Sequence, residues 1–221
     1  MSAVLMLHGY KGTWNNGWFA PIQYKLRGLK IPVISPSLPN PERPDYHQWK
    51  EVILNIIDEH FLQSKNEQNI IIVAHSLACF AVLRLIDEFL ISSQSAPGNI
   101  SIINRFKCLI LVAPIVSYHQ KFPQFTDYKF SLHNHNNYIN QIKINPIHAY
   151  LIYSIDDNYV DIEVMHDFIS NFIDKNQKET LNSEEEKNYI DLCYIEKKGY
   201  QHFMQDDIPF ITELVVQTCF K

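Results

Sequence analysis

Glycine is scarce in this chain, and its scarcity argues against one large group of functions. Only six of the 221 residues are glycine, and neither a GxGxxG pattern nor a Walker pattern occurs. Loops that bind phosphate need such glycines, because their backbone must approach the phosphate groups closely. We therefore expect no nucleotide and no other organic cofactor.

An excess of basic residues and long apolar runs are also lacking. The 19 lysines and arginines are outnumbered by 24 acidic residues, which gives a formal net charge of −5 and a pI near 6.0. General nucleic-acid-binding proteins are basic, so nucleic acid is not expected as a partner. No apolar run approaches the roughly 18 residues of a membrane-spanning helix. The N-terminal residues show neither the basic region nor the cleavage site of a signal peptide.

Cysteine is sparse and isolated. Cys79, Cys108, Cys193 and Cys219 lie far apart in apolar surroundings, which fits a reduced, cytoplasmic compartment better than a disulfide framework. Apolar residues make up 46% of the chain and charged residues 19%, a composition that excludes a disordered chain. The length suits a single domain, residues 1–221, with a full hydrophobic core.

Apolar runs alternate with helical patterns from end to end. Strands are predicted at residues 4–7, 31–34, 69–74, 108–112, 148–153 and 189–195. Helices are predicted near residues 49–57, 77–86, 161–172 and 207–219. The third run, N-I-I-I-V-A, is apolar on both faces, as in a central parallel strand. The sequence therefore predicts an α/β fold, in which helices cover both faces of a mostly parallel sheet of about six strands.

One long stretch interrupts this alternation. Residues 114–146 are rich in aromatic residues, histidine and asparagine, and we expect a small cap segment there. Its aromatic residues, Phe125 and Phe130 among them, either line an apolar substrate pocket or cover a sheet edge. Its histidines lie among asparagines without regular ligand spacing, so we expect no metal site.

The strongest functional signal surrounds Ser76. The sequence I-I-I-V-A-H-S-L-A-C-F-A-V-L-R runs from a buried strand directly into a buried helix, with Ser76 at the junction. In the G-x-S-x-G elbow, a sharp turn exposes a nucleophilic serine at the C-terminal edge of the sheet. Here Ala74 and Ala78 replace both glycines. The alternative is a serine that only caps the helix.

A nucleophilic serine needs a histidine base, and that histidine needs a carboxylate. With this kind of elbow the chain order is serine, then aspartate or glutamate, then histidine. Asp156 and Asp157 follow the predicted strand at 148–153, and His202 follows the last predicted strand. Each residue alone also fits a turn, a helix cap or a core position. The order of all three favours a Ser-His-Asp arrangement.

Two backbone N–H groups must bind the oxyanion that forms when a serine attacks a carbonyl group. Leu77, directly after the nucleophile, is one candidate, and the L-H-G-Y sequence after the first strand offers Tyr10. Gly9 allows the tight turn of that loop. We expect His8 to order the loop, and the side chain of His75 to point away from the nucleophile along the elbow.

A set of short motifs covers nearly the whole chain. They are H-G-Y at 8–10, the tryptophans Trp14 and Trp18, L-P-N-P at 38–41 followed by Trp49, A-H-S-L-A-C at 74–79, S-I-D-D-N-Y-V at 154–160 and H-F at 202–203. In these motifs the sequence resembles the small serine hydrolases related to YdeN and to retinoblastoma-binding protein 9. That family belongs to the α/β-hydrolase superfamily, and the resemblance implies a compact three-layer sandwich with a minimal cap.

By this resemblance, the catalytic residues are Ser76, Asp157 and His202. Because Asp156 and Asp157 are adjacent, their side chains leave an extended strand end on opposite sides, and only one can reach the imidazole. The family pattern aligns with the second aspartate. Gln201 stands where the family often has glycine, a departure that removes no catalytic atom.

The predicted function is hydrolysis of a small ester, thioester or amide through an acyl-serine intermediate. An ester is favoured, because its leaving group needs less activation. The alternative is a protein-interaction module on a hydrolase scaffold, with weak or no turnover, because the family's name records a binding role. The L-x-C-x-E pattern associated with that role is absent, since Leu192 and Cys193 are adjacent. A small acyl compound is therefore the expected partner; a protein partner is possible but not indicated.

Overall fold

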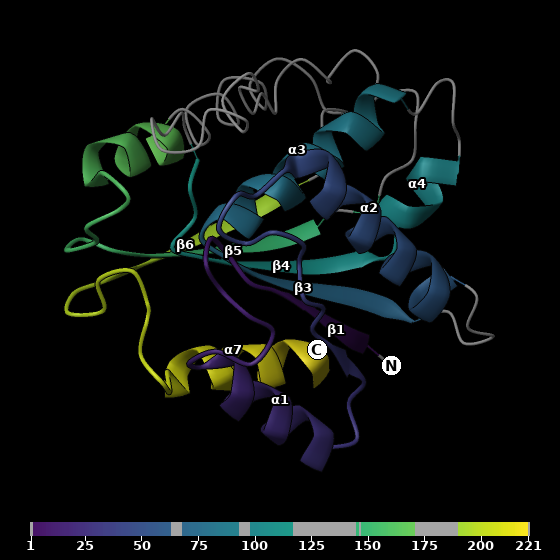
Figure 1. Cartoon of the computed structure of the whole chain (residues 1–221), viewed down its shortest axis with the longest axis horizontal. Coiled ribbons are helices and arrows are strands. Elements are labelled where there is room, and N and C mark those ends of the chain that lie inside the picture. Colours follow the sequence, from purple (N-terminus) through teal and green to yellow (C-terminus); the bar gives the residue numbers. More distant parts are fainter. Residues whose placement is uncertain are drawn as a thin grey trace, which may run out of the picture.

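The described residues form a parallel sheet with helices on both faces (Figure 1). The computed structural model describes residues 2–62, 68–92, 98–116, 145, 147–170 and 190–220. The sheet has six strands in the order β2-β1-β3-β4-β5-β6. This arrangement confirms the predicted α/β fold with a mostly parallel, six-stranded central sheet.

All five strand pairs of the described sheet are parallel, so the carboxyl ends of the strands share one edge. The strands are β1 (Ser2–Leu7), β2 (Val33–Ile34), β3 (Asn69–His75), β4 (Phe106–Val112), β5 (Ile147–Ser154) and β6 (Ile190–Lys197). In Figure 1 this edge lies at the left, where the loop after β1 and the loop before the last helix meet. Each of the six strands corresponds to a predicted apolar run.

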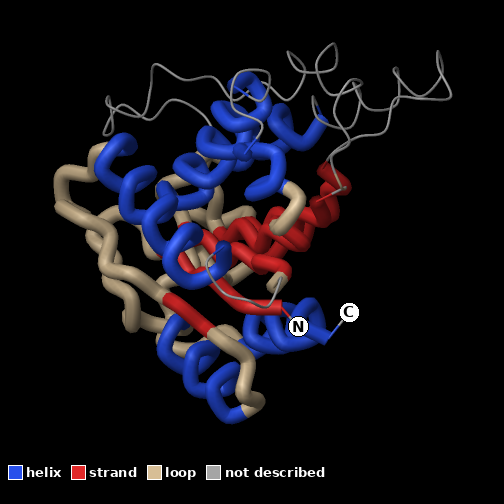
Figure 2. The backbone as a smooth tube through the Cα atoms, turned by 90° about the vertical axis from the view of Figure 1, so that its right-hand side faces the viewer, coloured by secondary structure: helices blue, strands red, loops and turns tan. Residues whose placement is uncertain are grey.

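Helices cover the two faces of the sheet in two groups. They are α1 (Phe19–Gly28), α2 (Tyr46–Ile56), continued by a π-helical turn (Ile57–Leu62), α3 (Leu77–Ser92), α4 (Gly98–Ile103) and α7 (Pro209–Phe220); residues 162–170 are also helical. Helices α1 and α7 lie on one side of the sheet, and α2, α3 and α4 lie on the other (Figures 1 and 2). Among the described residues, no helix is both long and apolar enough to cross a membrane.

Strand β1 shows why the central strands are apolar throughout. Ala3, Leu5 and Leu7 belong to the core beneath α2 and α3, whereas Val4 and Met6 belong to the core beneath α1 and α7. All five side chains are buried, because helices cover both faces of the sheet. The two cores therefore hold the sheet from both sides and fix the positions of the loops at its edge.

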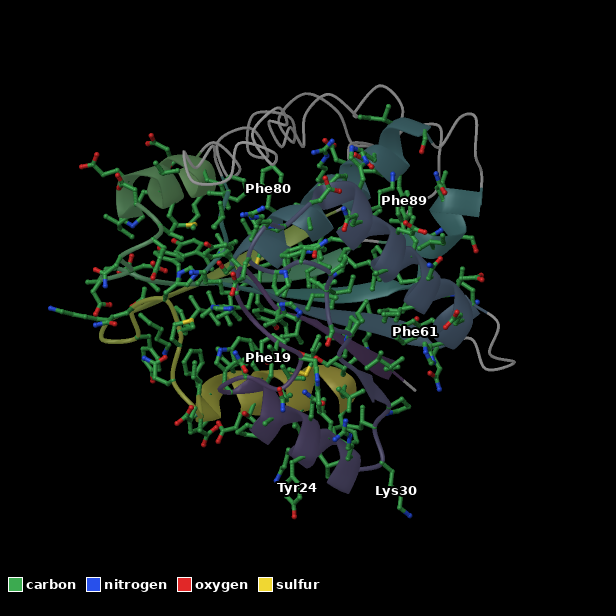
Figure 3. The ribbon with its side chains drawn as sticks, viewed as in Figure 1. Phe19, Tyr24, Lys30, Phe61, Phe80 and Phe89 are labelled. Carbon is green, nitrogen blue, oxygen red and sulfur yellow. The ribbon has the colours of Figure 1, made fainter. Side chains whose placement is uncertain are left out.

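Helix α1 is not among the helices that the sequence predicts. Its buried residues, Phe19, Ile22, Gln23 and Leu26, follow helical spacing, but Pro21 falls within its first turn. A proline is tolerated there, because the first turn has N–H groups without intrahelical acceptors. No side chain caps the helix at its N-terminus, so the usual start signal is missing. In Figure 3, Phe19 points toward the sheet, whereas Tyr24 and Lys30 point outward.

Asp45 begins α2 as its N-cap residue. Its Oδ1 accepts a hydrogen bond from the backbone N–H of Gln48 at 2.9 Å. The side chain of Gln48 does not complete a capping box in return, because its Oε1 accepts a hydrogen bond from Asn40 Nδ2 at 3.0 Å. The cap therefore depends on the carboxylate oxygen of Asp45 alone.

We expect Asp45→Ala to lower the free energy of unfolding by about 1 kcal/mol, because the N–H of Gln48 loses its acceptor. Asp45→Asn keeps an acceptor oxygen at the same place and should retain most of that stability. Urea denaturation of the three proteins measures both effects. Equal losses in the two variants would show that the cap hydrogen bond is not the source of the stability.

Candidate active site

Ser76 lies in a sharp turn between β3 and α3. Its φ angle is +56°, in the left-handed region that residues other than glycine seldom adopt. Its N–H donates to the carbonyl oxygen of Val112 at 2.8 Å, and its carbonyl oxygen accepts from the N–H of Cys79 at 3.0 Å. A serine that merely caps a helix has extended backbone. The turn instead matches a nucleophile elbow, with the small, fully buried Ala74 and Ala78 in place of the glycines.

His202 and Asp157 lie beside this turn, although they come from two other loops. His202 belongs to the loop between β6 and α7, and Asp157 follows β5. The distance from His202 Nε2 to Ser76 Oγ is 2.8 Å. His202 Nδ1 lies 2.8 Å from Asp157 Oδ2 and 3.1 Å from Oδ1. The structure therefore brings the three predicted residues into one hydrogen-bonded chain.

The partners of His202 determine which nitrogen carries its proton. A carboxylate can only accept, so Nδ1 donates to Asp157 and the neutral ring leaves Nε2 to accept from the hydroxyl of Ser76. The carboxylate of Asp157 is held in turn by the N–H groups of Tyr159, at 2.7 Å, and Val160, at 3.1 Å. The Tyr159 ring packs on the imidazole, with 4.8 Å between ring centroids. The Asp157 side chain is only 2% exposed, so water hardly competes for these bonds.

Asp156 has a different set of partners. Its Oδ1 accepts from the hydroxyl of Ser154 and from the N–H of Gly199, the latter at 3.0 Å. The bond from Ser154 is the main reason that the pKa of Asp156 lies below its usual range, and the bond from Gly199 adds to it. Asp156 thus ties the end of β5 to the loop that carries His202, while Asp157 contacts the imidazole.

The two residues predicted to supply the oxyanion donors lie on different elements, Leu77 directly after Ser76 and Tyr10 in the loop after β1. Leu77 is the first residue of α3, and the first N–H groups of a helix have no intrahelical acceptor. Tyr10 lies in the loop after β1, directly after Gly9. A Cβ atom on Gly9 would lie 2.7 Å from the Cβ of Ser76 and 2.8 Å from the carbonyl oxygen of His75. Glycine is therefore required for this loop to lie against the serine turn.

His8 holds the same loop in place. Its Nδ1 donates to the carbonyl oxygen of Gly9 at 3.0 Å, and its Nε2 accepts from the N–H of Leu38 at 2.9 Å. Both bonds require a neutral ring that is protonated at Nδ1. Burial lowers the pKa of His8 and favours that neutral form. These contacts agree with the expectation that His8 orders the loop.

A cleft of about 720 Å³ opens next to Ser76 and His202. It lies between the loop after β1 and the loop before α7, and its lining includes Tyr159, Met204 and Lys11. The volume is within the range of pockets that hold small organic ligands. Aliphatic, aromatic and charged groups all reach it, so the described walls are mixed in character.

The predicted cap falls almost entirely outside the described residues. Of residues 114–146, only 114–116 and 145 are described. Phe125 and Phe130 lie outside them, and their role in a substrate pocket stays a prediction. Within the described ranges, no group of three or more His, Cys, Asp or Glu side chains could hold a metal ion.

The side chain of His75 differs from the expectation. Its ring turns toward the loop that carries His202, with 5.1 Å between the two ring centroids, and its Nε2 lies 2.9 Å from the carbonyl oxygen of His202. Alternation along β3 was a usable signal, because Ile71 and Val73 face the core beneath α1 and α7. His75, two residues further on, lies on that same face.

Comparison with known proteins identifies relatives of this chain. The profile of the family described as serine hydrolase matches residues 4–178, well over half of the chain. The chain belongs to the serine hydrolase family. YdeN from Bacillus subtilis (strain 168) is 28% identical over 103 residues, which make up 47% of this chain and 50% of YdeN. The match thus spans about half the length of that relative, and it confirms the resemblance inferred from the motifs.

Solved structures show the same fold over the whole chain. The crystal structure of the ydeN gene product from B. subtilis matches with a TM-score of 0.67 and 20% identity, and the match covers 100% of both chains. Est1E from Butyrivibrio proteoclasticus matches with a TM-score of 0.55 and 14% identity, over 100% of this chain and 89% of Est1E. A hydrolase of the α/β superfamily from Xanthomonas campestris pv. campestris has a TM-score of 0.51 and 9% identity, over 99% and 96%. This serine hydrolase therefore has the α/β-hydrolase fold.

We expect Gly9→Ala to lower the free energy of unfolding by about 1–3 kcal/mol, because the added methyl group overlaps the backbone of the serine turn. Gly28→Ala is the matched control. A Cβ atom at Gly28 meets nothing within 4 Å, and Gly28 is the last residue of α1, so alanine there should leave the stability unchanged or raise it slightly. Chemical denaturation measures both variants. An unchanged stability for Gly9→Ala would contradict the close approach of the two loops.

Proposed function

We propose that this hydrolase cleaves a small ester, thioester or amide through an acyl-serine intermediate. Ser76 is the nucleophile, His202 the general base and acid, and Asp157 the group that orients and stabilises the imidazole. The observation that carries the proposal is the hydrogen-bonded chain through these residues, with 2.8 Å from Ser76 Oγ to His202 Nε2 and 2.8 Å from His202 Nδ1 to Asp157 Oδ2.

Acylation begins when Ser76 Oγ attacks the substrate carbonyl carbon and its proton passes to His202 Nε2. The carboxylate of Asp157 then faces an imidazolium ion, whose charge it stabilises. The N–H groups of Tyr10 and Leu77 bind the oxyanion of the tetrahedral intermediate. One such donor typically lowers the activation free energy by about 3–4 kcal/mol. The intermediate collapses as His202 gives its proton to the leaving group, and the acyl group stays on Ser76.

Deacylation repeats these steps with water as the nucleophile. His202 takes a proton from the water, the hydroxide attacks the acyl-serine carbonyl, and the proton returns to Ser76 Oγ as the acid leaves. The bonds that form and break need only the groups of the chain and the water. The reaction as proposed therefore requires no cofactor.

An ester is the favoured substrate class. An alkoxide leaves more readily than an amine anion, so an ester asks less of His202 as the general acid. Est1E, which shares the fold, has been solved with ferulic acid bound. Ferulic acid is a carboxylic acid, the acyl product that hydrolysis of an ester, a thioester or an amide releases, so it agrees with an acyl substrate here without distinguishing the three bonds.

Replacing the nucleophile is the direct test of the proposal. We expect the folded wild-type protein to be labelled by a fluorophosphonate probe, and Ser76→Ala to abolish that labelling. Turnover of a short aryl ester should fall by about 10⁴-fold or more, because no hydroxyl remains to form the acyl intermediate. Mass spectrometry of the labelled protein identifies the modified residue.

The outcomes of this test separate the two predicted functions. Retained turnover in Ser76→Ala would mean that another residue is the nucleophile. No labelling of the folded wild type would favour the interaction module with weak or no turnover. Circular dichroism of both proteins serves as the control for folding.

The adjacent aspartates provide a second test. Asp157→Asn should lower turnover by about 10²- to 10⁴-fold, because an amide can donate to Nδ1 and favour the wrong tautomer of His202. Asp156→Asn should leave turnover close to that of the wild type and should lower the thermal midpoint instead, because it weakens the tie to Gly199. Turnover and the thermal midpoint are measured on both variants. The reverse pattern would show that Asp156, not Asp157, orients the imidazole of His202.

A further inference from the structure

The loop that carries His202 has an unfavourable backbone conformation. Gln201 and Phe203, the residues on either side of His202, have φ angles of +48° and +55°, and Gly199 has +84°. Side chains make the left-handed region unfavourable for a residue other than glycine. A loop with two such residues needs contacts from outside to keep its shape.

Two residues from other parts of the chain supply those contacts. His75 Nε2 lies 2.9 Å from the carbonyl oxygen of His202. The indole Nε1–H of Trp18 donates to the carbonyl oxygen of Phe203 at 2.9 Å, and the backbone N–H of Trp18 donates to the carbonyl oxygen of Gln205 at 3.1 Å. We call His75 and Trp18 the clamp. It holds the loop by the carbonyl groups of His202 and of the residues that follow.

The clamp fits closely against the loop. Gly17, next to Trp18, has a φ of +49°, and a Cβ atom there would lie 2.7 Å from the carbonyl oxygen of Gln205. The rings of Trp18 and His75 meet edge to face, with 5.8 Å between centroids. Both side chains are buried, Trp18 to 2% exposure and His75 to 9%. Bulk water is therefore largely excluded from the clamp's hydrogen bonds, and their loss would leave buried carbonyl oxygens unpaired.

His75 acts in this contact as a neutral donor. A carbonyl oxygen only accepts, so the proton of the ring is on Nε2. Burial, followed by the charge of His202, lowers the pKa of His75 to about 3, against the smaller opposing influences of the hydrogen bond to the His202 carbonyl group and of Asp157. The neighbouring His8 also disfavours a charge on His75. A neutral His75 does not repel the imidazolium that forms at His202, and it does not compete for the proton of Ser76.

We propose that His75 is a positioning residue for the reaction: its Nε2–H bond to the carbonyl oxygen of His202 holds the strained loop so that His202 Nε2 stays within hydrogen-bond distance of Ser76 Oγ. This inference rests on the proposed function. The contact acts directly on His202, because the carbonyl group that accepts from His75 belongs to the same residue as the catalytic imidazole. A misplacement of about 1 Å at a reacting group can lower a rate by about 10²-fold.

The test compares two replacements of similar size. His75→Gln retains an N–H donor at the end of its side chain, whereas His75→Met fills the space without one. We expect His75→Met to lower kcat on a short aryl ester by about 10- to 100-fold with KM changed less than about twofold. We expect His75→Gln to stay within about threefold of the wild type. Trp18→Phe, which removes the second donor, should lower kcat in the same way.

Hydrogen–deuterium exchange provides a readout that needs no activity. Amide exchange in residues 199–205 should be faster in His75→Met than in the wild type and unchanged in His75→Gln, while exchange in β3 stays the same in all three. An active wild type with His75→Met equal to it in kcat and exchange would overturn the positioning role alone. Equal losses of kcat in the Gln and Met variants would also overturn it, because the hydrogen bond would then not matter. An inactive wild type that no fluorophosphonate labels would overturn the proposed function, and with it the catalytic role of His75.

Discussion

The left-handed turn at Ser76 is the constraint on which the rest of the site depends. Its backbone conformation is unfavourable for serine, and it persists because the N–H of Ser76 is bonded to Val112 in the neighbouring strand and because α3 is buried from its first residue. The turn brings Oγ to the edge of the sheet. It also decides which residues its neighbours can be: Gly9 must lack a side chain, and Ala74 and Ala78 must be small.

The parallel sheet brings the other parts of the site to that turn. Because all described strands run in the same direction, the loops after β1, β3, β5 and β6 leave from one edge. Strands β5 and β6 stay paired up to Ser154 and Lys197, so the two loops that follow begin side by side. The bonds from Gly199 to Asp156 and from Tyr200 to Ser154 then keep these loops together beyond the last strand pair.

Much of this arrangement could be predicted from the sequence, and the physical reason lies in its local signals. The central strands β1, β3 and β4 are buried almost throughout and were visible as apolar runs. The edge strand β6 is mostly exposed or half-buried and carries a weaker apolar run. Ser76 was visible because a strand, a sharp turn and a helix follow one another without a gap. Helix α1 was missed because Pro21 and the absence of a capping side chain hide its start. The clamp could not be predicted for another reason. Its bonds join His75 and Trp18 to backbone carbonyl groups 127 and 185 residues away, and every residue has such a group, so the sequence does not indicate which one accepts.

Three histidines near the site show that the hydrogen-bond partners of a histidine, rather than its residue type, determine what its ring can do. His8 uses its Nε2 to accept a backbone N–H, and His75 uses its Nε2 to donate to a backbone carbonyl, so the Nε2 of neither ring can accept the proton of Ser76. Of the three, only His202 has a carboxylate, that of Asp157, bonded at Nδ1 and a hydroxyl, that of Ser76, bonded at Nε2. The two buried rings that take no proton from Ser76 instead fix the backbone on either side of it: His8 holds the loop with the expected oxyanion donor Tyr10, and His75 holds the loop with the base. The same side chain therefore supplies, within one site, the proposed base and two supports for it.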